Sequence, residues 1–287
     1  MKAVTWARKY GMKVLIDVHG SPGSQNGFDN SGHAGTVAWQ TGDYLAKTTS
    51  VLVQVAKKYG TAAFADVVWG IELTNEPISW GANDNSVTKS WTQSAYAAVR
   101  NAAPNKNLNI IMHDAFMGPA SWTGVGANLN RGASMSNAKF FVDTHLYQNQ
   151  VAADSTLAQW QHIAKACKWR STDLLPASDK LPVIVGEFSA ATNICVYPDG
   201  STTAGTTCNK AGCQCPATLP WVANWNAQLK IKTRRFFEAQ IDTFEKQAQG
   251  WFMWSYKGYG GWSMEQLFEG GVLGPTVMTR KYPHVCG

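Results

Sequence analysis

The sequence predicts an α/β fold in which parallel strands alternate with helices to form a (β/α)8 barrel. Three observations lead to this prediction: short apolar runs that resemble buried strands, amphipathic stretches between them, and polar residues where the runs end. The strand candidates are residues 13–19, 67–73, 108–113, 140–145, 182–188 and 250–254. Each run is nearly continuously apolar, as expected of parallel strands that are buried on both faces.

The stretches between the strand candidates have the periodicity of amphipathic helices. Residues 3–10 form a helix-like stretch that ends at Gly11, and residues 43–58 repeat apolar side chains up to a stop at Gly60. Residues 154–169 and 233–248 show the same kind of pattern. Alternating strands and helices are typical of βαβ units, which build either an open sheet or a barrel.

Polar and aromatic residues at the strand ends favour the barrel. They are Asp17, His19, Asn75, Glu76, His113, Asp114, His145, Tyr147, Glu187, Trp254 and Tyr256. Barrel enzymes build their sites from the C-terminal ends of several strands. A nucleotide-binding open sheet would instead need a Gly-rich phosphate loop after an early strand, and the sequence contains none of the usual forms. The six strand candidates are two fewer than a closed barrel needs.

The composition and the charge limit the kinds of binding partner that we expect for the chain. The 287 residues are 45% hydrophobic and 15% charged, which is typical of a chain with a folded core. The formal net charge is +6, but the densest basic segment, residues 232–235, has the pattern of a solvated helix end, so we expect no nucleic acid partner. No long apolar run or signal peptide is visible, so no membrane partner is expected either. The 13 Trp residues are explained mostly by packing in the core, but tryptophan also stacks well against sugar rings.

Six cysteines lie in the second half of the chain: Cys167, Cys195, Cys208, Cys213, Cys215 and Cys286. An even number, with four in one loop, favours disulfides and an oxidising compartment. The rival is a zinc site in that loop, but the spacing matches no common zinc pattern and no His lies nearby. We therefore expect no metal. The irregular stretch at about 190–224 is expected to form a Cys-rich excursion over the barrel mouth.

Two glutamates at strand ends provide a pair of carboxyl groups for cleavage of a glycosidic bond. Glu76 follows Asn75 and precedes Pro77, and Glu187 lies in Gly-Glu-Phe. Such hydrolysis needs one carboxyl group to protonate the leaving oxygen and another to attack the sugar or activate water. Asn75 is suited to bond a sugar 2-hydroxyl. The alternative for Glu76 is a cap on the following helix. The nearby Glu72 is a weaker candidate, because no asparagine precedes it as Asn75 precedes Glu76.

Three further strand-end residues fit a sugar site. His145 and Tyr147 point to the same strand face, since alternate residues of a strand do so. The Tyr147 hydroxyl is placed to orient a carboxylate, and His145 is placed to bond sugar hydroxyls. Trp254 suits a platform under the sugar that is cleaved. For the histidine and the tryptophan, structural roles in the core are the competing interpretation.

Five blocks of sequence resemble the fungal exo-β-1,3-glucanases of glycoside hydrolase family 5. They are residues 13–32, Asn75-Glu76-Pro77, residues 143–148, residues 186–189 and residues 250–257. The resemblance covers essentially the whole chain. It implies a retaining enzyme that releases glucose from β-1,3-glucan by double displacement, with Glu76 as acid/base and Glu187 as nucleophile. This chemistry needs no metal or organic cofactor.

The resemblance also implies roles for other residues. It places His19, Asn75, His145, Tyr147 and Trp254 around the cleaved glucose. Phe28 matches one of two aromatic residues that clamp the glucan, whereas the second position falls near Gln150, which is not aromatic. A Cys167–Cys286 disulfide is suggested, with Cys195 bonded to Cys208, Cys213 or Cys215.

Members of this family begin well before the point that matches Met1. We therefore expect residues 1–287 to form a single barrel domain made of strands three to eight, with the first two strands missing. The resemblance and the cysteines suggest a secreted or cell-wall protein, which we expect to be a monomer. Two alternatives remain. One is an endo-acting β-glucanase or cellulase on the same barrel, and the other is a truncated, non-catalytic glucan-binding form.

Overall fold

The computed structural model describes residues 2–287, which divide into two compact units. The first unit runs up to Thr144 and also includes Ala177–Val183. The second unit comprises His145–Pro176 and Ile184–Gly287. Among residues 2–287, no helix combines the length and apolarity needed to cross a bilayer.

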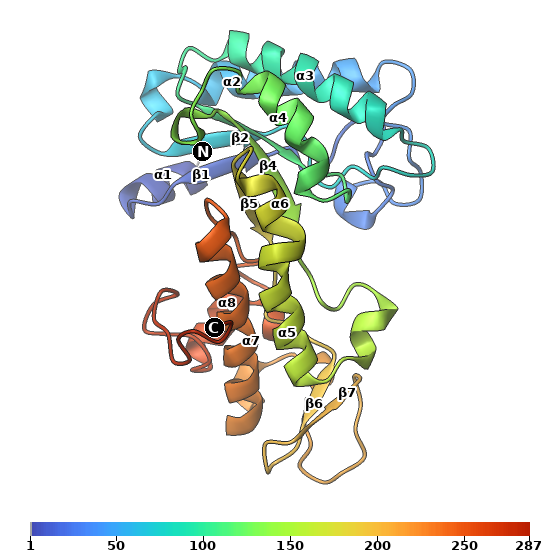
Figure 1. Cartoon of the computed structure of the whole chain (residues 1–287), viewed down its shortest axis with the longest axis vertical. Coiled ribbons are helices and arrows are strands. Elements are labelled where there is room, and N and C mark those ends of the chain that lie inside the picture. The colour runs from blue at the N-terminus through green and yellow to red at the C-terminus, as the bar shows by residue number, and fades with distance from the viewer. Residues whose placement is uncertain (1) are drawn as a thin grey trace. The chain divides into compact units, whose positions relative to one another are not determined.

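The strands of the main sheet follow one another in chain order, β1-β2-β3-β4-β5 (Figure 1). They are β1 (Val14–Asp17), β2 (Val68–Glu72), β3 (Asn109–His113), β4 (Phe140–His145) and β5 (Val183–Glu187). The pairs β1–β2, β2–β3 and β3–β4 are parallel. Sequential parallel strands with crossover helices are the topology of a (β/α)8 barrel. The predicted fold class, an incomplete barrel, is confirmed.

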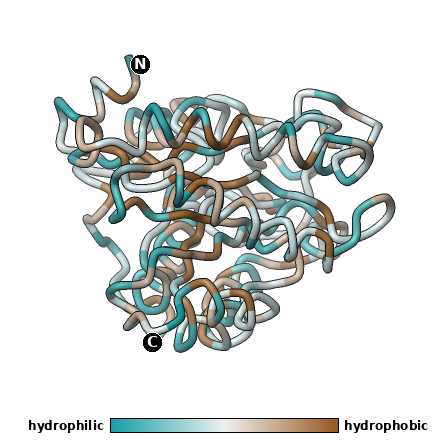
Figure 2. The backbone as a smooth tube through the Cα atoms, turned by 90° about the horizontal axis from the view of Figure 1, so that it is seen from above, coloured by the Kyte–Doolittle hydropathy of each residue, from teal (hydrophilic) through white to brown (hydrophobic). Residues whose placement is uncertain are grey.

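Helices alternate with these strands, and Figure 2 shows hydrophobic and hydrophilic residues alternating along the chain. The helices are α1 (Lys2–Lys9), α2 (Tyr44–Tyr59), α3 (Asn85–Ala102), α4 (Thr123–Leu129), α5 (Gln159–Trp169), α6 (Leu175–Ser178), α7 (Ala227–Gln247) and α8 (Met264–Glu269). Short 3-10 turns lie at Asp29–Ser31, Ala62–Phe64, Pro119–Trp122, Met135–Asn137, Ala152–Thr156, Pro216–Thr218, Val222–Asn224 and Gly260–Trp262. A π-helical turn, Arg170–Leu174, joins α5 to α6.

In the first unit, α2 and α3 pack side by side over the sheet (Figure 1). The buried residues of α2 are Thr48, Leu52 and Ala56, which are four apart and therefore share one face. The helix α3 begins at an N-cap, Asp84, whose side chain accepts hydrogen bonds from the backbone N–H groups of the first turn.

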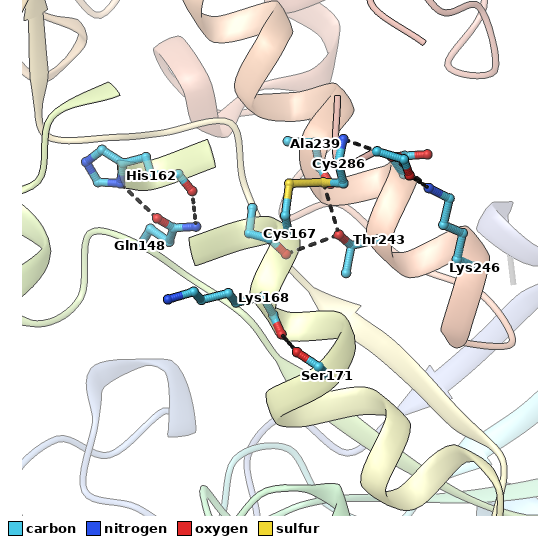
Figure 3. Close-up of a disulfide and its surroundings, with 12 residues drawn as sticks. Gln148, His162, Cys167, Lys168, Ser171, Ala239, Thr243, Lys246 and Cys286 are labelled. Atoms are coloured by element: carbon cyan, nitrogen blue, oxygen red, sulfur yellow. Dashed lines mark hydrogen bonds and ion pairs between the residues drawn. A yellow bond between two sulfur atoms is a disulfide. The ribbon is translucent and has the colours of Figure 1, made fainter. Parts of the chain in front are cut away.

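In the second unit, α5 packs against α7 and a disulfide fixes the chain end to this pair. Figure 3 shows Cys167 of α5 bonded to Cys286, with Thr243 of α7 beside them. The Thr243 hydroxyl donates to the carbonyl of Ala166 at 3.1 Å, which ties α7 directly to α5. The chain forms the cysteine pair that the resemblance suggests.

The Cys-rich stretch is more regular than predicted. It contains an antiparallel hairpin of β6 (Ile194–Val196) and β7 (Thr202–Ala204). Its four cysteines form the disulfides Cys195–Cys215 and Cys208–Cys213, so no described cysteine is free. Each of these four sulfur atoms carries a covalent partner, so the structure has disulfides where the rival interpretation placed zinc-binding thiolates.

Two sequence predictions about elements are wrong. Within the described chain, residues 250–254 form an isolated bridge at Trp251 rather than a sixth strand. The amide of Phe252 bonds to Val185, but the amide of Trp254 bonds to Phe188, one residue beyond the regular register. This shift interrupts the ladder. The basic segment 232–235 is also not a solvated helix end, because α7 begins earlier and Arg234 is buried within it.

Candidate active site

Glu76 lies in the first unit, four residues beyond the end of β2. Its backbone has φ +43°, in the left-handed region that residues other than glycine rarely adopt. Such conformations cost of order 1–3 kcal/mol and cluster at functional sites. The side chain is only 8% exposed. A buried carboxyl group on a strained turn is therefore a strong candidate for chemistry.

Three polar side chains from the loop after β1 brace this turn. Asn30 donates from Nδ2 to Oε2 of Glu76 at 3.1 Å. Asn26 donates to the Glu76 carbonyl at 3.0 Å. The buried amide of Gln25 donates to the carbonyls of both His19 and Asn75, each at 2.8 Å. The loop therefore fixes the backbone on both sides of Glu76 and also fixes the direction of its carboxyl group.

Two predicted sugar-binding residues accompany Glu76. The Nδ1 atom of His19 lies 2.8 Å from a carboxylate oxygen of Asp17, which sets the orientation of the imidazole ring. Asn75 is buried, and its Nδ2 has no hydrogen-bond partner among residues 2–287. A buried donor without a partner is costly unless a ligand or water satisfies it. The geometry therefore suits the predicted role of Asn75 toward a hydroxyl group.

Phe28 is exposed and belongs to an aromatic cluster of the first unit. Its ring centre lies 6.4 Å from that of Phe116, and the Phe116 ring lies 5.5 Å from that of Trp80. The side chains are half exposed, between 41% and 52%. The backbone amide of Phe28 donates to the side chain of Asn26 at 2.8 Å, so this cluster is connected to the loop that braces Glu76.

Glu187 ends β5 and lies in the second unit. The Tyr147 hydroxyl donates to its Oε2 at 2.7 Å, and Nδ1 of His145 lies 3.5 Å from the same oxygen. The backbone confirms this proximity, because the amide of Leu146 donates to the Glu187 carbonyl at 2.9 Å. A short hydrogen bond from a phenol to a carboxyl group fixes the orientation of that carboxyl group.

Trp254 also belongs to the second unit. Its backbone amide donates to the carbonyl of Phe188 at 2.8 Å, so it lies next to the strand end that carries Glu187. Its side chain is 42% exposed, which argues against simple core packing.

The structure thus groups the predicted residues within each unit. His19, Phe28, Asn75 and Glu76 lie on the loops of the first unit, whereas His145, Tyr147, Glu187 and Trp254 lie in the second. A pocket of about 530 Å³ in the first unit is lined by residues of the same loop, including Ser21 and His33, but not by Glu76. The candidate site is therefore defined by the hydrogen bonds around the carboxyl groups of Glu76 and Glu187.

Several residues of these surroundings were missed in the sequence. Gln25, Asn26 and Asn30 contact residues about 50 positions away, and no local pattern marks such contacts. The only signal was the run of small and amide residues after the first strand. Trp262, whose ring centre lies 5.4 Å from that of Tyr147, was also missed, because a tryptophan outside a strand end has no positional signal.

Sequential parallel strands with polar groups at their C-terminal ends are the arrangement of a barrel enzyme, and a pair of carboxyl groups is what barrel glycosidases use. The family model of cellulase, glycosyl hydrolase family 5, matches residues 1–260. The chain belongs to this family.

Two curated relatives illustrate the match. Glucan 1,3-beta-glucosidase of Blumeria graminis is 35% identical over 100% of this chain and 66% of its own length. The sporulation-specific glucan 1,3-beta-glucosidase of Saccharomyces cerevisiae is 35% identical over 99% of this chain and 64% of its own. The chain therefore spans about two thirds of these relatives.

Among solved structures, rutinosidase from Aspergillus niger superimposes with a TM-score of 0.65 and 20% identity, covering 94% of this chain and 69% of that one. Endo-glycoceramidase II from Rhodococcus sp. reaches a TM-score of 0.57 at 16% identity, covering 95% of this chain and 64% of that one. These two likenesses support the barrel fold.

Proposed function

We propose that the chain acts as a retaining glucan 1,3-β-glucosidase, which releases glucose from β-1,3-glucan. The observation that carries the proposal is the 2.7 Å hydrogen bond from Tyr147 to Glu187. This contact orients a carboxyl group at a barrel strand end, which supports the role of Glu187 as the nucleophile. Membership of family 5 and the names of the curated relatives support the same activity.

In the first step, a carboxylate oxygen of Glu187 attacks the anomeric carbon of the terminal glucose. The bond from that carbon to the glycosidic oxygen breaks, and the carboxylic acid of Glu76 gives its proton to the leaving oxygen. Tyr147 keeps the attacking carboxylate aligned. Asn75 takes the role of a donor to a sugar hydroxyl, a contact that strengthens as positive charge develops on the ring.

In the second step, the ionised Glu76 takes a proton from water. The water oxygen attacks the anomeric carbon, the bond to Glu187 breaks, and glucose leaves with its original β configuration. Asn30 holds the Glu76 carboxyl group for both proton transfers. Trp254 provides the platform under the glucose ring, and Phe28 contacts the sugar on the leaving side.

The natural setting of this activity is outside the cell or in the cell wall. Three disulfides within the second unit support an oxidising compartment. We propose that the protein acts there as a monomer.

Covalent labelling tests the assignment of the nucleophile. A 2-deoxy-2-fluoro-β-glucoside with a good leaving group slows both steps, so the glycosyl-enzyme should accumulate. Peptide mapping by mass spectrometry should locate the label on Glu187. A label on any other carboxylate would overturn the assignment.

Substitution of each glutamate tests the catalytic roles proposed for Glu76 and Glu187. Both Glu187→Gln and Glu76→Gln should lower glucose release from laminarin by at least about a thousandfold, because each removes a step of the reaction. For Glu76→Gln, the loss should be smaller on an aryl glucoside whose leaving group needs no proton. Glu245→Gln is the matched control, since Glu245 pairs with Arg280 at the surface and should lose little activity. Undiminished release in either active-site variant would contradict the proposal.

A further inference from the structure

The second unit displays two large aromatic side chains that the proposed reaction does not use. Trp221 is 54% exposed and Tyr259 is 62% exposed, with ring centres 5.6 Å apart. They border a groove of about 460 Å³ that is also lined by Lys257, Glu265 and Gln266. Flat apolar faces edged by polar groups suit the face of a pyranose ring and its hydroxyls.

A smaller pocket adjoins this groove. It has a volume of about 150 Å³ and is lined by Asn149, Asn193, Tyr259 and Trp262, among others. The Oδ1 atom of Asn149 is buried and has no hydrogen-bond partner among residues 2–287. Since a buried acceptor without a donor is costly, a hydroxyl group entering the pocket would satisfy it.

The groove and the pocket share a lining residue, and the pocket includes a ring that contacts a neighbour of Glu187. Tyr259 lines both of them. Trp262 also lines the pocket, and its ring lies 5.4 Å from the ring of Tyr147, which bonds to Glu187. Trp221, Tyr259, Trp262 and Asn149 are therefore linked through shared linings and ring contacts, within one unit, to the tyrosine that bonds the proposed nucleophile. We call this set the aromatic track.

Backbone contacts hold the aromatic track in place. The amide of Gly260 donates to the carbonyl of Pro220 at 2.8 Å, which joins the segment of Tyr259 to that of Trp221. The side chain of Gln266 accepts from the amide of Val222 at 3.1 Å and donates to the carbonyl of Gly258 at 3.0 Å. Both exposed rings are therefore carried on turns whose backbone is held by hydrogen bonds. Binding of a ligand then requires little further ordering of the backbone.

The charges along the groove disfavour a phosphate-bearing ligand. Lys257 lies 3.4 Å from Glu265, so its charge is already compensated. Glu269 adds a further negative charge to the lining. A nucleic acid or an anionic lipid would meet this negative edge unfavourably, whereas a neutral sugar would gain hydrogen-bond acceptors.

We propose that the aromatic track binds successive sugars of a neutral β-glucan chain and so makes the enzyme prefer long substrates over short ones. This proposal rests on the proposed function, because it takes glucan as the substrate. The track also provides aromatic contacts in a chain that has Gln150 where the resemblance leads us to expect an aromatic clamp residue.

Steady-state kinetics with a long and a short glucan oligosaccharide tests whether the aromatic track binds substrate. For Trp221→Ala and for Tyr259→Ala, the ratio of kcat/KM on laminarihexaose to kcat/KM on laminaribiose should fall about five- to tenfold. The loss should lie mainly in KM, because a remote subsite contributes binding rather than chemistry. Trp221→Phe keeps a flat ring and should restore much of the ratio. Trp160→Ala, which removes a 70% exposed tryptophan of α5 that lines none of these pockets, should leave the ratio unchanged.

Calorimetry separates this proposal from the proposed function. Laminarihexaose should bind to Glu187→Gln, and adding Trp221→Ala should weaken that binding about five- to tenfold. An unchanged affinity and an unchanged ratio in both alanine variants would overturn the aromatic track. If the unmodified protein binds the hexaose through Trp221 but releases no glucose, the track stands and the proposed activity fails.

Discussion

Gln25 shows how much of the candidate site depends on single side chains. One buried amide reaches the carbonyls of His19 and Asn75, and its own oxygen accepts from the amide of Ser21. All three contacts are short, between 2.8 and 2.9 Å, so the ends of β1 and β2 are held by one residue. A Gln25→Leu change would leave these polar groups buried without partners, a costly outcome.

The two carboxylates and their strand-end companions could be predicted from the sequence, because apolar runs mark the strands and polar residues at their ends stand out. The bracing side chains could not. Asn30 contacts Glu76 across 46 positions, and only the folded loop brings them together. The strained backbone of Glu76 is likewise invisible in a sequence, since an L-residue at positive φ carries no compositional mark.

His162 is a buried titratable residue of α5 (Figure 3). Its Nδ1 lies 2.8 Å from Oε1 of Gln148, and its ring packs against Phe236. Burial lowers the pKa of His162 from 6.5 to about 4; Asp154 opposes this shift and Lys165 adds to it. The folded chain therefore keeps this imidazole neutral at mildly acidic pH, where the unfolded chain protonates it.

We predict that His162 makes the protein less stable as the pH falls from about 6.5 toward 4. In this range the unfolded state binds the extra proton, so protonation favours unfolding, by at most about 3 kcal/mol at the acidic end. Urea unfolding at a series of pH values measures the effect. His162→Asn should flatten the curve, whereas the exposed His284→Asn should not. Identical pH dependence in all three proteins would contradict the prediction.

At the scale of elements, α7 shows why the basic segment was misjudged. The predicted helix began at residue 233, but α7 begins at Ala227, so residues 232–235 lie within it. Arg234 is buried and pairs with Glu238, and it also donates to the carbonyls of Val272 and Thr279. A helix position four residues from a glutamate predicts pairing, but it does not predict that the pair is buried.

We predict that Arg234→Ala lowers the free energy of unfolding by about 3–5 kcal/mol, because Glu238 would remain as an uncompensated buried charge. Glu238 also accepts from the amides of Lys281 and Tyr282, so the C-terminal segment should loosen as well. Arg235→Ala on the exposed side of the same helix should cost less than about 1 kcal/mol. Chemical denaturation compares the two variants, and equal losses would contradict the burial argument.

The strands were predicted best because parallel strands are buried on both faces and leave long apolar runs. All five strands of the main sheet coincide with predicted runs to within a few residues. The run at 250–254 is equally apolar, yet the shifted hydrogen bonds to Val185 and Phe188 prevent a ladder. Register depends on the partner strand, which no local pattern specifies. The β6–β7 hairpin was missed for a related reason, since each strand has only three residues.

At the scale of the whole molecule, the three disulfides differ greatly in the length of chain they close. Cys167–Cys286 spans 119 residues and Cys208–Cys213 spans only 5. The chain-entropy model assigns about 5 kcal/mol to a loop near the first length and about 2 kcal/mol to one near the second.

We predict that replacing Cys167 and Cys286 together with serine destabilises the protein by several kcal/mol and lowers its thermal midpoint. Replacing Cys208 and Cys213 together should have less than half this effect. Calorimetric scans of the two double variants measure the difference, and peptide mapping without reduction verifies the remaining bonds. A larger loss from the short loop would show that entropy of the unfolded chain is not the main contribution.

All six cysteines lie in the second unit, and the first unit has none. The surroundings of Glu76 thus rely only on non-covalent contacts, which form equally well in a reducing cytoplasm. The second unit, which carries Glu187, is cross-linked by three disulfides. Production in a reducing bacterial cytosol would therefore leave the unit that carries Glu187 without its disulfides, whereas a periplasm or an endoplasmic reticulum would allow them to form.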